Sequence, residues 1–84
     1  MTYRIETTRR FEKDFKRLSL DVRRRIDTQL RMLETDPIAG KALRGDFTGT
    51  YSLRVGEYRV LYAIDHSAKR IILLTAGHRA KVYG

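Results

Sequence analysis

The fold is decided by residues 51–62, which read YSLRVGEYRVLY. On each side of the central Gly56-Glu57 pair, alternate residues are apolar, which is the period-two pattern of a half-buried β-strand. A glycine at the first of two turn residues is typical of a tight II′ turn. The stretch therefore predicts a β-hairpin made of two antiparallel strands, residues 51–55 and 58–64.

The register of this hairpin places two arginines opposite each other. With a two-residue turn at 56–57, Val55 is paired with Tyr58 and Arg54 with Arg59. Like charges directly opposite each other on neighbouring strands are unfavourable by roughly 0.2–1 kcal/mol. An anion held between them would turn this repulsion into a bidentate clamp, because guanidinium groups match the geometry of phosphate.

Upstream of the hairpin, the sequence predicts a short strand and two helices. Residues 3–6 alternate as a strand does, and Thr8 and Ser19 can each cap the N-terminus of a helix. Apolar residues then recur every three or four positions and form one stripe on each helix. The first stripe is Phe11, Phe15 and Leu18, and the second is Val22, Ile26, Leu30 and Leu33. Pro37 disfavours helical geometry at the preceding residue, so the second helix is expected to stop near residue 35.

Around the hairpin, the remaining segments complete a small sheet. Residues 38–50 carry three glycines and read as a loop, and 65–69 form a polar turn. Residues 71–74 are an uninterrupted apolar run, typical of a strand covered on both faces. The order β-α-α-β-β-β predicts an α+β fold, in which an N-terminal strand and a helical hairpin pack on an antiparallel sheet. The length predicts a single domain over residues 1–84.

The last strand is expected to gather further cationic side chains at one edge of the sheet. Antiparallel pairing with the second hairpin strand brings Ala76-Gly77 beside the start of that strand, where Arg59 is, so Arg79 arrives at the same edge with His78 and Tyr83 nearby. Arginines from separate elements would then form a phosphate-sized cationic pocket. A solvated basic face without a ligand is the alternative.

The composition points to a polyanionic partner without naming it. Eighteen lysines and arginines against ten acidic residues give a net charge of +8, spread over both halves of the chain. Such an excess of positive charge attracts a polyanion through counterion release, or it only keeps the protein soluble. There is no cysteine, no signal peptide pattern and no apolar run of the roughly 20 residues that span a membrane, so we expect a cytoplasmic protein.

A pocket of this kind suits cleavage of RNA without a metal ion. Arginine can hold the negative charge of a pentacoordinate phosphorus, but it stays protonated and is a poor base. Histidine transfers protons near neutral pH, which makes His78 a candidate acid or base. Tyr83 can donate a proton, stack on a nucleobase, or simply pack on the sheet. We expect neither cofactor nor metal, because the chain lacks an HExxH motif, paired carboxylates and a glycine-rich phosphate loop.

Several segments together resemble the RelE/ParE toxin superfamily. They are ALRG at 42–45, YSLRVGEYRVLY at 51–62, GHR at 77–79 and VY at 82–83. The resemblance covers essentially the whole chain. It implies a RelE-like fold and a toxin of a type II toxin–antitoxin system that cleaves mRNA in the ribosomal A site by metal-independent attack of the 2′-OH. A cognate RelB-like antitoxin would neutralise it, in a complex that can oligomerise.

The resemblance also implies roles for individual residues. Arg59 and Arg79 would stabilise the transition-state phosphate, and Arg54 would be a second basic residue of the hairpin. Tyr83 would orient the RNA. Three further residues are expected to contact RNA: Arg44, Lys41 and Lys81.

One departure from the family pattern leaves other functions open. Ser52 stands where the best-known members place a lysine proposed as general base, so the base of this chain is unassigned. A ParE-like poison of DNA gyrase would share the fold without RNA chemistry, although a gyrase binder needs no phosphate pocket. A catalytically weak module that binds RNA or an antitoxin is the third possibility, which Ser52 keeps open.

Overall fold

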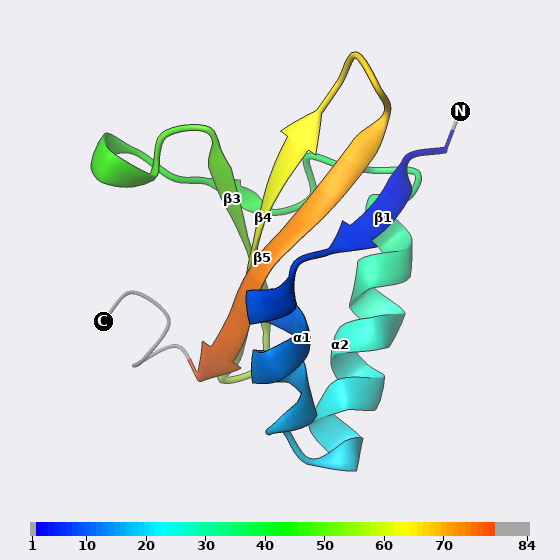
Figure 1. Cartoon of the computed structure of the whole chain (residues 1–84), viewed down its shortest axis with the longest axis vertical. Coiled ribbons are helices and arrows are strands. Elements are labelled where there is room, and N and C mark those ends of the chain that lie inside the picture. The colour runs from blue at the N-terminus through cyan, green and yellow to red at the C-terminus, as the bar shows by residue number, and fades with distance from the viewer. Residues whose placement is uncertain (1, 79–84) are drawn as a thin grey trace.

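The computed structural model describes residues 2–78. Its central element is one mixed β-sheet (Figure 1). Its strands are β1 (Arg4–Thr7), β2 (Lys41–Ala42), β3 (Thr50–Val55), β4 (Tyr58–Asp65) and β5 (Arg70–His78), in the order β1-β5-β4-β3-β2. The helices are α1 (Arg9–Lys16) and α2 (Leu20–Leu33), and a short 3-10 helix, η1, spans Gly45–Phe47. The predicted α+β fold and the predicted order of its main elements are confirmed.

Both helices begin at the residues that their sequence signals indicated. The Thr8 hydroxyl accepts the Phe11 backbone N–H at 3.1 Å, and the Ser19 hydroxyl accepts that of Val22 at 3.3 Å. Each cap satisfies a backbone donor that the first turn of a helix leaves without an intrahelical partner. α2 ends at Leu33, two residues before the predicted limit.

The sheet differs from the predicted antiparallel sheet at both of its edges, by a parallel pairing at one and by an additional antiparallel strand at the other. β1 pairs with β5 in parallel, with Ile5 beside Ile71, which extends the apolar face of the sheet. At the other edge, Lys41 and Ala42 form a two-residue strand inside the segment expected to be a loop. Neither pairing has a local signal, because one joins the two ends of the chain and the other is too short to show a period.

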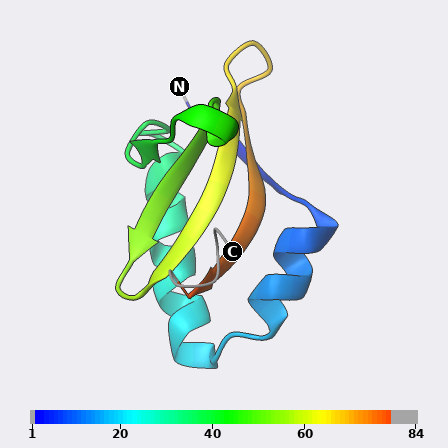
Figure 2. The ribbon, with the colours of Figure 1, turned by 90° about the vertical axis from the view of Figure 1, so that its left-hand side faces the viewer.

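The two helices cover different parts of the sheet. α2 runs behind the sheet toward β3, whereas α1 lies beside the edge of β5 (Figure 2). The core lies between the helices and one sheet face, where Ile26, Leu33 and Val60 are fully buried. Neither α1 nor α2 covers the opposite face, which is turned toward the viewer in Figure 2, and we call it the open face.

Tyr62 ties the segment after α2 to the middle of the sheet. Its fully buried hydroxyl donates to the Pro37 carbonyl at 2.8 Å and accepts the Gly40 N–H at 3.0 Å. Gly40 has no room for a side chain, since a Cβ would lie 2.6 Å from the Tyr62 hydroxyl and 3.0 Å from the Ser52 carbonyl. Burial raises the pKa of the Tyr62 phenol, so the group stays a neutral donor. This contact fixes the entry into β2.

None of the helices within residues 2–78 is long and apolar enough to cross a lipid bilayer.

Tyr62→Phe is expected to lower the free energy of unfolding by about 1–3 kcal/mol, because two buried backbone groups lose their partner. Chemical denaturation measures the change. Tyr51→Phe is the matched control, since the stacked ring of Tyr51 makes no hydroxyl hydrogen bond with residues 2–78. Equal effects of the two substitutions would contradict the proposed role of the Tyr62 hydroxyl.

Candidate functional site

The β3–β4 hairpin has the register that the sequence predicted. Val55 pairs with Tyr58 and Arg54 with Arg59, across a turn in which Gly56 has a φ of 61°. A positive φ at the first turn residue alone is the signature of a II′ turn, and glycine adopts it without steric cost. The two arginines are therefore neighbours on adjacent strands.

Both arginines lie on the open face of the sheet. Tyr58 and Val60 pack against the core, and side chains alternate along a strand, so Arg59 between them points the other way. Its Nη1 donates to the Ser52 hydroxyl at 3.4 Å, and Ser52 is only 3% exposed. Arg54 is exposed, and its Nε donates to the Gly56 carbonyl at 3.2 Å. The paired arginines thus bond in opposite directions along the hairpin, Arg59 to the buried Ser52 and Arg54 to the turn at Gly56.

Lys41 adds a third cation to this face. It is exposed and pairs with Ser52 across β2 and β3, and directly paired residues share a face of the sheet. Arg44 is placed differently. It caps η1, next to Leu43, whose N–H bonds to the Thr50 carbonyl at the start of β3. Thr50 precedes Arg54 by four positions in β3, which is about 13 Å along the strand at roughly 3.3 Å per residue.

His78 lies on the other side of the sheet from these cations. It pairs with Tyr58, not with Arg59, and the two rings meet edge to face with centroids 5.7 Å apart. Gly77 is the residue opposite Arg59, which agrees with the prediction that the Ala76-Gly77 end of this strand lies beside Arg59. Because His78 follows Gly77 by one position, alternation turns its side chain toward the helices. The structure brings His78 to the expected end of the sheet but not beside the Arg54–Arg59 pair.

The other candidates of the chain's last segment lie outside the described residues. They are Arg79, Lys81 and Tyr83.

Asp14 fixes α1 against the end of β5, and the sequence analysis did not single it out. Its carboxylate accepts the Thr75 hydroxyl, the Ala76 N–H at 3.4 Å and Arg10 Nε at 3.2 Å. Burial by itself raises the pKa of Asp14, but these hydrogen bonds and the Arg10 charge outweigh it and hold the pKa below the ordinary 3.8. The signal was available: residue 14 falls within the apolar stripe of α1, where an acidic side chain needs partners.

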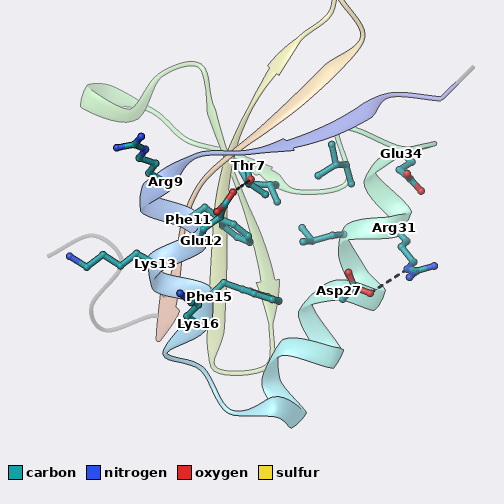
Figure 3. A pocket seen from close by; sticks show the side chains of 13 residues that line it. Thr7, Arg9, Phe11, Glu12, Lys13, Phe15, Lys16, Asp27, Arg31 and Glu34 are labelled. Atoms are coloured by element: carbon teal, nitrogen blue, oxygen red, sulfur yellow. Dashed lines mark hydrogen bonds and ion pairs between the residues drawn. The ribbon is translucent and has the colours of Figure 1, made fainter.

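A groove of about 880 Å³ opens between α1 and α2 (Figure 3). Phe11, Phe15 and Leu30 contribute its apolar lining, and Figure 3 shows Phe15 extending from α1 toward α2. On the α2 wall, Asp27 and Arg31 form an ion pair at 3.4 Å. Phe15 remains partly exposed because the helices diverge, although its place in the predicted stripe would suit a closed helical hairpin.

Comparison with known proteins identifies the family. Residues 5–83 match the family described as "ParE toxin of type II toxin-antitoxin system, parDE". The chain belongs to the RelE/ParE toxin superfamily.

Among relatives of this toxin chain, Toxin RelG of Mycobacterium tuberculosis is 42% identical over 52 residues, which are 61% of this chain and 60% of RelG. The matched stretch thus spans less than two thirds of that relative. A chain of the toxin–antitoxin complex RelBE2 from the same species is 30% identical, with a TM-score of 0.88 over 94% of this chain and 100% of that chain. The archaeal RelE–RelB complex from Pyrococcus horikoshii OT3 gives 29% identity and a TM-score of 0.81, over 98% of this chain and 100% of that one.

The toxin's stability should depend on the charge of Asp14. A carboxyl group whose pKa is lower in the folded than in the unfolded protein stabilises the fold fully above the unfolded value and loses this effect as pH falls through the folded value. Asp14→Asn should therefore lower the free energy of unfolding by about 1–3 kcal/mol at pH 7 and weaken its decline below about pH 4.

Denaturation at pH 7 and along an acid series measures both effects. Asp21→Asn is the matched control, because this exposed carboxylate only forms a surface ion pair with Arg25 and should contribute less than about 1 kcal/mol. A pH dependence of Asp14→Asn identical to that of the unsubstituted toxin would contradict the assignment.

Proposed function

We propose that this toxin is a ribosome-dependent endoribonuclease that cleaves mRNA in the A site. The observation that carries the proposal is the side-by-side placement of Arg54 and Arg59 on the open face. Two guanidinium groups on one rigid hairpin can hold the non-bridging oxygens of a single phosphodiester. A protein under selection for stability alone has no reason to pair like charges here.

The chemistry of the proposed reaction is an attack within the RNA strand. The 2′-oxygen loses its proton and bonds to the adjacent phosphorus, the bond from phosphorus to the 5′-oxygen breaks, and that oxygen leaves with a proton. Negative charge accumulates on the phosphorus oxygens during the step. Arg54 and Arg59 would stabilise this charge, and removal of one such preorganised donor typically lowers the rate by about 10²–10³. Arg79, by family resemblance, would act at the same phosphate, and Tyr83 would orient the RNA.

The open face carries cations but no established base. Ser52 cannot act as a lysine would, and His78 lies on the other face. Lys41, beside Ser52, would bind the RNA backbone, and Arg44 and Lys81 would bind it farther from the scissile phosphate. A site of this kind depends on the ribosome to align the 2′-oxygen with the phosphorus, since positioning can supply a large share of a barrier reduction. Free RNA should be a poor substrate, and the site of action is the cytoplasm.

The groove between α1 and α2 provides a surface for the antitoxin. The RelBE2 structure is a toxin–antitoxin complex, and the Pyrococcus horikoshii structure is a RelE–RelB complex. An apolar groove bordered by charged side chains suits an amphipathic segment that folds when it binds. We propose that a RelB-like antitoxin docks here and that the resulting complex can oligomerise.

One observation favours a second candidate function. The family that matches residues 5–83 carries the name of the ParE toxin, so poisoning of DNA gyrase is the competing activity. It would need no phosphate-binding arginines.

Arg59→Ala is expected to lower the rate of mRNA cleavage on translating ribosomes by about 10²–10³, because one phosphate ligand is lost. Mapping of mRNA 5′ ends after addition of purified toxin measures cleavage, and a supercoiling assay with gyrase runs in parallel. Arg24→Ala is the matched control, since Arg24 is an exposed arginine on α2. Inhibited supercoiling with intact mRNA would favour the gyrase activity, and unchanged cleavage by Arg59→Ala would remove the role of the arginine pair.

A further inference from the structure

A second pocket lies at the same end of the sheet as the arginine pair, but on the helix side. It encloses about 340 Å³, and the residues that matter here are Arg10, Asp14, Arg17, Tyr58, Gly77 and His78. We call it the strand-end pocket. Its volume lies at the lower end of the range of roughly 300–1,000 Å³ found for small-molecule sites, which suits one nucleotide and not a folded RNA.

The strand-end pocket adjoins the open face through the end of the sheet. Gly77 lines the pocket and is also the residue paired with Arg59. His78 and Tyr58 form the next pair along the same two strands, with side chains directed to the helix side. A ligand that passes around this end of the sheet would meet Arg59 on one face and His78 on the other.

The pocket offers an aromatic surface. Tyr58 is half-buried and packs against the core, so its ring is held in place, and His78 is exposed with its ring edge-on to Tyr58 at 78°. Proteins that bind single-stranded RNA stack unpaired bases on aromatic side chains, histidine among them. A His78 ring supported by a fixed tyrosine is suited to the same contact.

The pocket also offers a cation for a phosphate. Arg17 is exposed, and its guanidinium makes no ion pair or hydrogen bond with residues 2–78. Asp14 is the one carboxylate among the described lining residues. Its oxygens already accept hydrogen bonds from Thr75, Ala76 and Arg10. Its negative charge is thus balanced within the protein, so Arg17 is left to attract an anion.

We propose that the strand-end pocket binds a nucleotide of single-stranded RNA adjacent to the one held at the open face, with its base on His78 and a phosphate on Arg17. This inference rests on the proposed function and deepens it, because it assigns His78 to binding and not to proton transfer. The RNA strand would then pass around the end of the sheet between Arg59 and His78.

A binding experiment tests the pocket without requiring cleavage. The probe is a 2′-O-methyl trinucleotide, which lacks the attacking hydroxyl, titrated into ¹⁵N-labelled toxin. Chemical-shift changes are expected at Arg17 and residues 75–78 as well as at Arg54 and Arg59. His78→Ala should weaken binding about 5- to 150-fold, the range found for loss of one base–aromatic stack. Shifts that spare residues 75–78 would overturn the pocket, whether or not the open face responds.

Substitution of His78 by another aromatic residue separates binding from catalysis. His78→Phe keeps a stacking ring and removes the transferable proton, so it should retain both trinucleotide affinity and the maximal cleavage rate on ribosomes. Arg17→Ala should raise the apparent KM with little change in kcat, and Arg24→Ala should change neither. A large loss of kcat in both His78→Phe and His78→Ala would overturn the proposal and restore His78 as an acid or base. Absence of cleavage by the unsubstituted toxin would instead refute the proposed function, while the titration still decides the pocket.

Discussion

The register of the β3–β4 hairpin positions the arginine pair and the core side chains together. A two-residue turn at Gly56 fixes it, and the core enforces it, because a shift by one residue would move every side chain of a strand to the opposite face. Leu53, Val55 and Val60 would then leave the core. Burial of these side chains therefore outweighs the repulsion between Arg54 and Arg59, which are kept together on the open face by apolar contacts behind them.

The same alternation divides the end of the sheet into two chemically different surfaces. Arg59 and Gly77 form one cross-strand pair, and Tyr58 and His78 form the next, so cations face one way and aromatic rings the other. A strand of RNA could use both, with its scissile phosphate on the open face and a neighbouring base in the strand-end pocket. α1 closes that pocket through Asp14, and its divergence from α2 creates the groove proposed for the antitoxin.

The sequence predicted the parts of this arrangement that depend on local signals. The turn at Gly56 gave the pairing of Arg54 with Arg59, and Thr8 and Ser19 marked the starts of both helices, since turn geometry and capping act over a few residues. The placement of the Ala76-Gly77 end of β5 beside Arg59 followed from antiparallel topology, and the structure adds the exact pairing of Gly77 with Arg59.

Features that join distant segments could not be read in the same way. The parallel pairing of β1 with β5 and the two hydrogen bonds of Tyr62 depend on tertiary packing. The sequence did not indicate which face of the sheet His78 occupies. The preceding residue, Gly77, has no side chain, so the alternation of inward and outward side chains cannot be followed to this end of β5. The place of Asp14 in the apolar stripe of α1 indicates burial, but its partners Thr75 and Ala76 come from the other end of the chain and have no local signal.

The most direct test of the central claim is a double-substitution cycle on the rate of mRNA cleavage, measured in single turnovers on ribosomes with Arg54→Ala, Arg59→Ala and both together. If the two guanidinium groups hold one phosphate, the double variant should be little slower than the slower single variant, because residues that act as a unit are strongly non-additive. Losses that multiply, as expected for independent sites, would show that the two arginines do not share a phosphate.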